Sequence, residues 1–182
     1  RSDRATILDV QARHAPEGLF SRPPLVLHVE VQTADGQVRL YMLNNHFTSM
    51  SGGEEATEPR RTAQAKWNVT LVEEILDTDP QALVAVIGDL NSYFVSAPIQ
   101  ALREGGLVHA FDSLDPAERY TYIFEGESEV LDHILFTPAL MAALRRVEVL
   151  HVNSDYPLAA PDDRSPRHKS DHDPVVVTFT IQ

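Results

Sequence analysis

The sequence has 182 residues, of which 43% are hydrophobic and 23% are charged, as in an ordinary globular protein. That length suits one domain covering residues 1–182. The absence of cysteine excludes thiol catalysis, disulfides and cysteine-based zinc sites. The apolar runs are far shorter than the roughly 18 residues that a membrane span needs, and the net charge of −12 disfavours long-range attraction to nucleic acid.

Two strands and a long helix are expected in the first half of the chain. Alternating apolar residues predict strands at 25–31 and 38–42, joined by a hairpin turn at Asp35-Gly36. Thr57 offers an N-cap for a helix with Pro59 in its first turn, which Asp79-Pro80 ends. An apolar stripe on this helix comprises Ala63, Trp67, Leu71, Val72, Ile75 and Leu76.

The second half of the chain has shorter elements. The apolar run at 83–87 predicts a buried strand, and a short helix is expected from Pro98 to Gly105-Gly106. Further strands are expected at 120–124, 130–136, 147–150 and 175–181, with the first two joined through Glu125-Gly126, a helical turn at 138–143 and a long loop at 153–170. Many short strands with few helices predict an α+β fold, a layered α/β sandwich.

Four clusters of acidic and histidine residues lie on or beside these strands. His46 follows the second strand, and Asp89 with Asn91 follows the third. Asp171-His172 precedes the last strand, and Asp132-His133 lies within the strand at 130–136. Residues at strand ends often share one cleft, so we expect these clusters to meet.

Each cluster also has a structural interpretation when taken alone. Asp89 fits a plain turn, Asp171-His172 an exposed pair at a strand start, and His46 a histidine with satisfied hydrogen bonds. Asp132 is different, because a carboxylate within an apolar strand is unfavourable without a partner, so we expect it to pair with a histidine. No role is assigned to the remaining histidines: His14, His28, His109, His133 and His151.

Together the clusters resemble a known family. The order Asn-His-Phe, Gly-Asp-Leu-Asn, Leu-Asp-His-Ile-Leu and Ser-Asp-His-Asp-Pro is similar to the C-terminal part of the endonuclease/exonuclease/phosphatase superfamily, over residues 21–181. The segment from Arg119 to Gly126 looks especially like bacterial secreted nucleases. The resemblance therefore implies a secreted protein and part of a two-layer β-sandwich flanked by helices.

The resemblance also implies roles for individual residues. The implied catalytic residues are His46, Asp89, Asn91, Asp132 and His172. The implied metal ligands are Asp89, Asn91 and Asp171, for Mg²⁺ or Mn²⁺, with Ca²⁺ as a third candidate. The implied contacts to substrate phosphate are Asn45, Arg61, Arg167 and Lys169; the last two lie in a basic loop with Arg164 and His168 that is alternatively an ordinary solvated loop.

A nuclease that cleaves DNA by in-line attack of activated water is the first functional expectation. The alternatives are a phosphatase or a sphingomyelinase-like phosphodiesterase, and a catalytically incomplete fragment. Tyr120 and Tyr122 are candidates for stacking on a base, although core packing is expected for at least one of them.

The sequence departs from the family pattern at its start. The N-terminal asparagine motif and the Gln-Glu motif of the family, whose glutamate binds metal, are not found in residues 1–20. We therefore expect a truncated domain that lacks the N-terminal half of the fold. An uncovered sheet face would favour self-association or pairing with that half.

Overall fold

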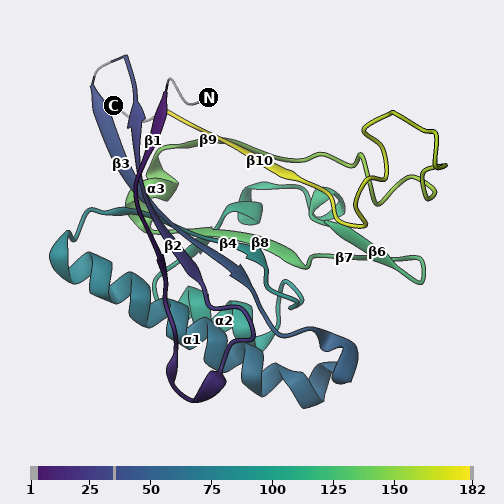
Figure 1. Cartoon of the computed structure of the whole chain (residues 1–182), viewed down its shortest axis with the longest axis horizontal. Helices are drawn as coiled ribbons and strands as arrows, with labels where there is room; N and C mark the ends of the chain where they lie inside the picture. Colours follow the sequence, from purple (N-terminus) through teal and green to yellow (C-terminus); the bar gives the residue numbers. More distant parts are fainter. Residues whose placement is uncertain (1–3, 35, 181–182) are drawn as a thin grey trace.

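The computed structural model describes residues 4–34 and 36–180 (Figure 1). The strands are β1 (Ala5–Ala12), β2 (Leu25–Gln32), β3 (Gln37–His46), β4 (Leu83–Asp89), β5 (Val108–His109), β6 (Tyr122–Phe124), β7 (Glu127–Glu129), β8 (Asp132–Phe136), β9 (Leu144–Val149) and β10 (Val175–Phe179). The helices are α1 (Glu54–Thr78), α2 (Ala97–Glu104) and α3 (Pro138–Ala142), with 3₁₀ turns at Pro16–Gly18, Met50–Gly52, Ala110–Ser113 and Pro116–Glu118. Asp35 of the predicted hairpin and Ile181 of the predicted last strand lie outside the described residues.

Six strands form the main sheet, in the order β1-β2-β3-β4-β8-β5. The β3 and β4 strands are parallel, because α1 crosses over between them, and β8 runs antiparallel to β4. The carboxyl ends of β3 and β4 therefore lie beside the start of β8. This arrangement brings three separate chain segments to one end of the sheet.

The two faces of this sheet are covered by different layers. One core packs β3 and β4 against α1 and α2, with Leu43, Val86, Leu71 and Leu102 buried within it. The other core lies between the sheet and the β9-β10 ribbon, a second and smaller β layer visible across the top of Figure 1. This layering confirms the predicted α+β class.

The inward face of α1 is more polar than the sequence predicts. Arg61, Gln64 and Asn68 are fully or almost fully buried beside Leu71 and Val72, whereas Trp67 is only partly buried. Their polar atoms are hydrogen-bonded: Arg61 bonds within the first turns of α1, Gln64 bonds to the loops before β2 and after β3, and Asn68 bonds to Asn45 of β3. The helix also begins at Glu54 after Gly53, one turn before the expected start at Thr57, whose hydroxyl instead donates back to the Gly53 carbonyl at 2.7 Å.

Two predictions about the strands are wrong or incomplete. The segment at 120–124 was expected to join the strand at 130–136 directly, but β6 pairs with the short β7 and β8 pairs with β4 and β5. The exposed strand β1 was not predicted, because its residues, including Ile7 and Val10, show no buried face and a register shift interrupts their alternation.

None of the helices in the described ranges is long and apolar enough to span a membrane.

Candidate active site

Three site residues form a row across neighbouring strands. His46 of β3 pairs in register with Asp89 of β4, and Asp89 pairs in register with Asp132 of β8. Paired residues point to the same side of a sheet, so these three side chains lie on one face. Nε2 of His46 lies 3.7 Å from Oδ2 of Asp89. Asp132 is the first residue of β8, so it too occupies a strand end rather than a strand interior.

His172 approaches this row from the loop before β10. Its Nδ1 bonds to Oδ2 of Asp132 at 2.6 Å, and about a quarter of each side chain is exposed. The hydrogen bond to Asp132 is the main reason that the pKa of His172 is raised, and the charges of Asp132, Asp89 and Asp171 raise it further against the opposing effect of burial. The imidazolium form is favoured, with Nε2 left to face the cleft.

His46 is held by an arginine that the sequence analysis did not single out. Nη1 of Arg22 lies 2.8 Å from Nδ1 of His46. A guanidinium only donates hydrogen bonds, so Nδ1 of His46 must accept, and the neutral ring carries its proton on Nε2, toward Asp89. The exposed Arg22 therefore sets the orientation of His46 and adds one positive charge to an acidic site.

A tight turn after β4 orients Asp89 and Asn91. Oδ1 of Asp89 accepts from the backbone N–H of Asn91 at 2.9 Å, and the Asn91 side chain donates to the Phe47 carbonyl at 3.2 Å. Asn91 adopts a positive φ of 46°, a conformation that asparagine tolerates better than most residues. Burial is the largest cause of the raised pKa of Asp89, with the Asn91 hydrogen bond opposing it and Asp132 adding to it.

Asn45 lies on the α1 side of β3 and does not face the cleft. It is buried on the opposite face of β3 and exchanges two hydrogen bonds of 2.9 Å with Asn68 of α1. From this position the Asn45 side chain does not reach a phosphate bound at the row, contrary to the predicted phosphate contact. Its visible role is to fix the end of β3 that carries His46.

Asp173 and Asn153 hold the loop that carries His172. The buried Asp173 carboxylate accepts from the backbone N–H groups of Asn153 and Ser154 and from the Ser154 hydroxyl, and it contacts Nδ1 of His151. Asn153 donates from its side chain to the His172 carbonyl at 2.7 Å. These contacts connect residues about twenty positions apart, which is why no local sequence pattern indicated them.

Three of the predicted phosphate contacts, Arg61, Arg167 and Lys169, contact residues outside the row. Arg61 is 0% exposed and bonds to Thr57 and to the Glu54 carbonyl, so its guanidinium does not reach the surface. Arg167 lies over the Tyr156 ring at 4.5 Å, and Lys169 donates to the Asp163 carbonyl at 2.6 Å. These contacts stabilise the loop at 153–170 itself. Asp171 is exposed next to His172.

His133 faces away from the site, as expected from its place beside Asp132. It is fully buried and lies 2.9 Å from His109, while its Nε2 contacts the Ser92 carbonyl at 2.7 Å. The His109 Nδ1 accepts from the Phe111 N–H, so the pair forms one directed chain of hydrogen bonds. Burial lowers the pKa of His133 to about 4, which keeps this ring neutral.

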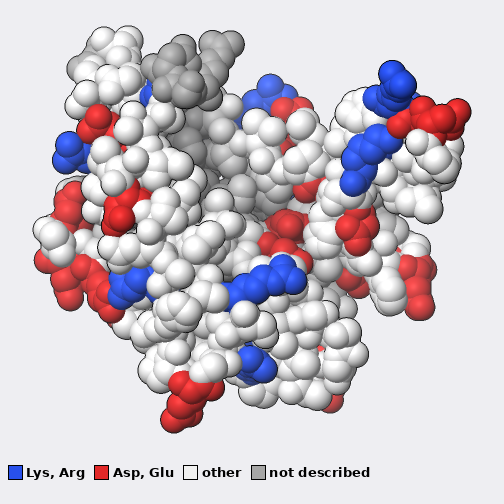
Figure 2. Space-filling model, in the orientation of Figure 1, with Lys and Arg blue, Asp and Glu red and all other residues white. Residues whose placement is uncertain are grey.

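The row offers oxygen donors suited to a hard divalent cation. Asp89 supplies a carboxylate and Asn91 an amide oxygen, and Asp171 adds an exposed carboxylate beside His172. Within residues 4–34 and 36–180 no three acidic, histidine or cysteine side chains form a complete cage. An incomplete set still suits Mg²⁺, which commonly binds one or two carboxylates together with water and substrate phosphate. Figure 2 shows acidic side chains gathered in the hollow near the middle of this face.

The layered α+β fold thus places His46, Asp89 and Asp132 in a row at one end of its main sheet. The model of the Endonuclease/Exonuclease/phosphatase family matches residues 16–155. The chain therefore belongs to this family. The search of curated proteins returned no match.

Solved structures share this fold at low sequence identity. A truncated TDP2 from Caenorhabditis elegans is 18% identical with a TM-score of 0.65, covering 98% of this chain and 67% of that chain. D. rerio TDP2 complexed with a single strand DNA product is 20% identical with a TM-score of 0.68, covering 100% and 70%. A mannosyl-6-phosphatase from Bacteroides thetaiotaomicron is 18% identical with a TM-score of 0.64, covering 100% and 69%. This chain thus spans about two thirds of the length of these structures.

Proposed function

We propose that this chain hydrolyses phosphodiester bonds with the help of a divalent cation, and that DNA is its substrate. One observation carries the proposal: His46, Asp89 and Asp132 form a continuous row in register, and His172 joins that row through a 2.6 Å contact with Asp132. The residue types match the needs of phosphoryl transfer, which are a cation, a proton carrier and donors to phosphate oxygens.

The side chains divide the work as follows. His172, held as an imidazolium by Asp132, donates from Nε2 to an oxygen of the reacting phosphate and stabilises the charge that develops there. Asp89 accepts a hydrogen bond from the attacking water and directs it in line with the leaving oxygen. His46 presents its Nε2 proton beside Asp89.

Asp89, Asn91 and Asp171 are the residues that would hold Mg²⁺ or Mn²⁺. When bound, the cation neutralises charge on the phosphate oxygens. This assignment has a readout besides activity: titration of Mn²⁺ followed by calorimetry or electron paramagnetic resonance should show one site in the wild type. Asp89→Asn should weaken that site, whereas Asp163→Asn, in the exposed loop, should not.

A small phosphoester is the second candidate substrate class. The net charge of −12 and the acidic hollow oppose the approach of a long polyanion more than that of a small molecule. A phosphatase or a sphingomyelinase-like phosphodiesterase would act on such a small or weakly charged substrate. Release of phosphate from sugar phosphates, or of phosphocholine from sphingomyelin, without cleavage of DNA would favour this second candidate.

The deciding experiment measures cleavage of supercoiled plasmid and of bis(p-nitrophenyl) phosphate. The purified chain is assayed with Mg²⁺, with Mn²⁺ and with a chelator. We expect cation-dependent turnover that His172→Ala lowers by at least about 10²-fold. His14→Ala is the matched control, because this exposed histidine lies in the loop after β1, and it should keep wild-type activity.

Two results would contradict the proposal. Turnover that survives His172→Ala would exclude the row as the reacting site. A folded chain that cleaves neither substrate with either cation would favour the catalytically incomplete fragment.

A further inference from the structure

The β6-β7 hairpin presents a chemically distinctive face beside the row. Tyr122 pairs in register with Glu129, so both side chains lie on the same side of the hairpin. Phe124, two residues after Tyr122, shares that side. Tyr120, the other candidate for base stacking, instead stacks on the His151 ring at 3.9 Å and bonds to Asp155. Tyr122 is therefore the tyrosine of this segment that faces the cleft.

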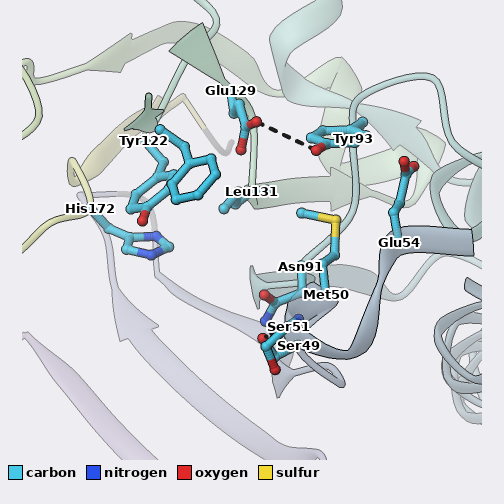
Figure 3. A pocket seen from close by; sticks show the side chains of 11 residues that line it. Ser49, Met50, Ser51, Glu54, Asn91, Tyr93, Tyr122, Glu129, Leu131 and His172 are labelled. Carbon is cyan, nitrogen blue, oxygen red and sulfur yellow. Dashed lines mark hydrogen bonds between the residues drawn. The ribbon is translucent and has the colours of Figure 1, made fainter. Parts of the chain in front are cut away.

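This face lines a pocket that opens directly onto the catalytic residues (Figure 3). The pocket has a volume of about 500 Å³. His172 and Asn91 form the side nearest the row, and the Tyr122 ring lies 4.9 Å from the His172 ring. Because His172 also lines this pocket, a group bound in it would lie beside the phosphate that His172 contacts and would belong to the same substrate.

Two nearly parallel aromatic rings give the pocket an apolar surface for stacking. The Tyr122 and Phe124 rings are 6.4 Å apart and inclined by only 13°. Phe124 is 53% exposed, although a phenylalanine gains more from burial. An exposed aromatic pair beside a reacting phosphate is suited to stacking on a planar ring, because every nucleobase has a π face.

Apart from His172, the charged side chains that line the pocket are carboxylates. Glu129 and Glu54 line it together with the Tyr93 hydroxyl, which donates to Glu129 at 3.4 Å. Of the described residues that line it, none is a lysine or an arginine. A second phosphate would be repelled here, whereas a ring that donates a hydrogen bond to a carboxylate would be favoured. An exocyclic amine is such a donor, and glutamate accepts from the N4 amine of cytosine.

We propose that this pocket binds the nucleobase next to the scissile phosphate, stacked on Tyr122 and Phe124, and selects an amine-bearing base through Glu129. The proposal rests on the proposed phosphodiesterase function and names the substituent that the same site recognises. It separates cytosine from thymine most sharply, because thymine presents a carbonyl oxygen where cytosine presents its amine.

The test compares two esters whose bases differ in the exocyclic amine and in the C5 methyl group of thymine. The p-nitrophenyl esters of deoxycytidine 5′-phosphate and thymidine 5′-phosphate have the same leaving group and the same sugar. We expect kcat/KM for the cytosine ester to exceed that for the thymine ester by about tenfold, the scale of one good base contact. Equal values for the two esters would overturn the proposal.

Substitutions assign the preference to Glu129. Glu129→Gln replaces one carboxylate oxygen by an amide that donates, so the preference for cytosine should vanish or reverse. Glu125→Gln is the matched control: it removes the same charge from the turn of the same hairpin, at an exposed residue outside the pocket lining, and it should keep the preference. If both variants lose the preference for cytosine, the loss of one negative charge explains the result, and the assignment of the preference to Glu129 is overturned.

The stacking platform has its own readout. Phe124→Leu should raise KM for both nucleoside esters about fivefold or more without changing the ratio of their kcat/KM values, because every base has a π face. If no ester is cleaved, bis(p-nitrophenyl) phosphate included, the proposed function fails but the pocket remains testable. Saturation-transfer NMR with deoxycytidine and thymidine then decides: stronger transfer to deoxycytidine, lost in Glu129→Gln, supports the pocket, and equal or absent transfer overturns it.

Discussion

At the scale of single residues, the site depends on the pairing of His172 with Asp132. The 2.6 Å contact raises the pKa of His172, so the ring stays protonated to higher pH than an isolated histidine with its pKa near 6.5. In the folded protein this proton is also stabilising. The stabilisation is complete below the unfolded pKa and is lost as pH rises through the folded pKa.

The first prediction concerns the pH dependence of this pair. Asp132→Asn removes the negative partner, so the pKa of His172 should fall and the alkaline limb of the pH–kcat profile should move to lower pH. We expect kcat at neutral pH to fall about 10²-fold. NMR titration of the His172 ring measures the pKa directly in both proteins. An unchanged pKa in the variant would show that Asp132 does not control the protonation of His172.

At the scale of secondary-structure elements, the close approach of β3 and β4 determines where the row lies. Gly88 has a φ of +128°, and a Cβ added there would lie 2.0 Å from the Asn45 carbonyl oxygen. No side chain fits between these two strands at this point. The glycine therefore allows His46 and Asp89 to lie side by side.

The second prediction tests this close approach. Gly88→Ala should lower the free energy of unfolding by about 3 kcal/mol or more, because it adds a backbone clash to the strain of a positive φ. Gly126→Ala is the control, since its φ is +88° but nothing lies within 4 Å of the added Cβ, and it should cost only about 1–2 kcal/mol. Urea unfolding measures both. Equal losses would mean that strain alone, without the clash, explains the effect.

Sequence patterns predicted the elements whose faces differ in polarity. The alternating strand β2, the apolar strand β4 and the final strand β10 lie where the periodicity placed them, and His46 and Asp89 follow from the strand ends. Patterns failed where burial does not follow hydrophobicity. Strand β1 is exposed on all residues, and the inward face of α1 carries Arg61, Gln64 and Asn68.

The residues that hold the site side chains in place could not be predicted for a related reason. Arg22 reaches His46, Asn68 reaches Asn45 and Asp173 reaches Asn153, each across about twenty residues of chain. Such partners are chosen by the three-dimensional packing of loops and helices. A single sequence carries no periodic signal for them, whereas the catalytic types stand out because carboxylates and histidines are unusual at the ends of apolar strands.

At the scale of the whole molecule, electrostatic repulsion opposes folding. The net charge of −12 is carried by only 182 residues, so carboxylates repel one another more strongly in the folded chain than in the expanded unfolded chain. Raising NaCl from about 0.01 M to about 0.15 M shortens the Debye length from about 30 Å to about 8 Å.

The third prediction follows from that screening. The same increase in NaCl should stabilise the chain by about 1 kcal/mol and raise Tm by roughly 2–4 °C. Near pH 5.5, where accessible histidines among the eight in the chain gain positive charge, the rise should be smaller. Thermal unfolding followed by circular dichroism at both pH values measures the difference. A Tm that does not respond to salt at pH 7 would show that attractive pairs offset the repulsion.

The register of the sheet also bears on the order of folding. His46, Asp89 and Asp132 come from three different strands, and His172 joins Asp132 across 40 residues of chain. Closing such distant segments is slow compared with forming the local contacts of α1. The reacting groups therefore meet only after the parallel pairing of β3 with β4 and the docking of β10 are complete. A partly folded chain carries every residue of the site but does not yet bring these four side chains together.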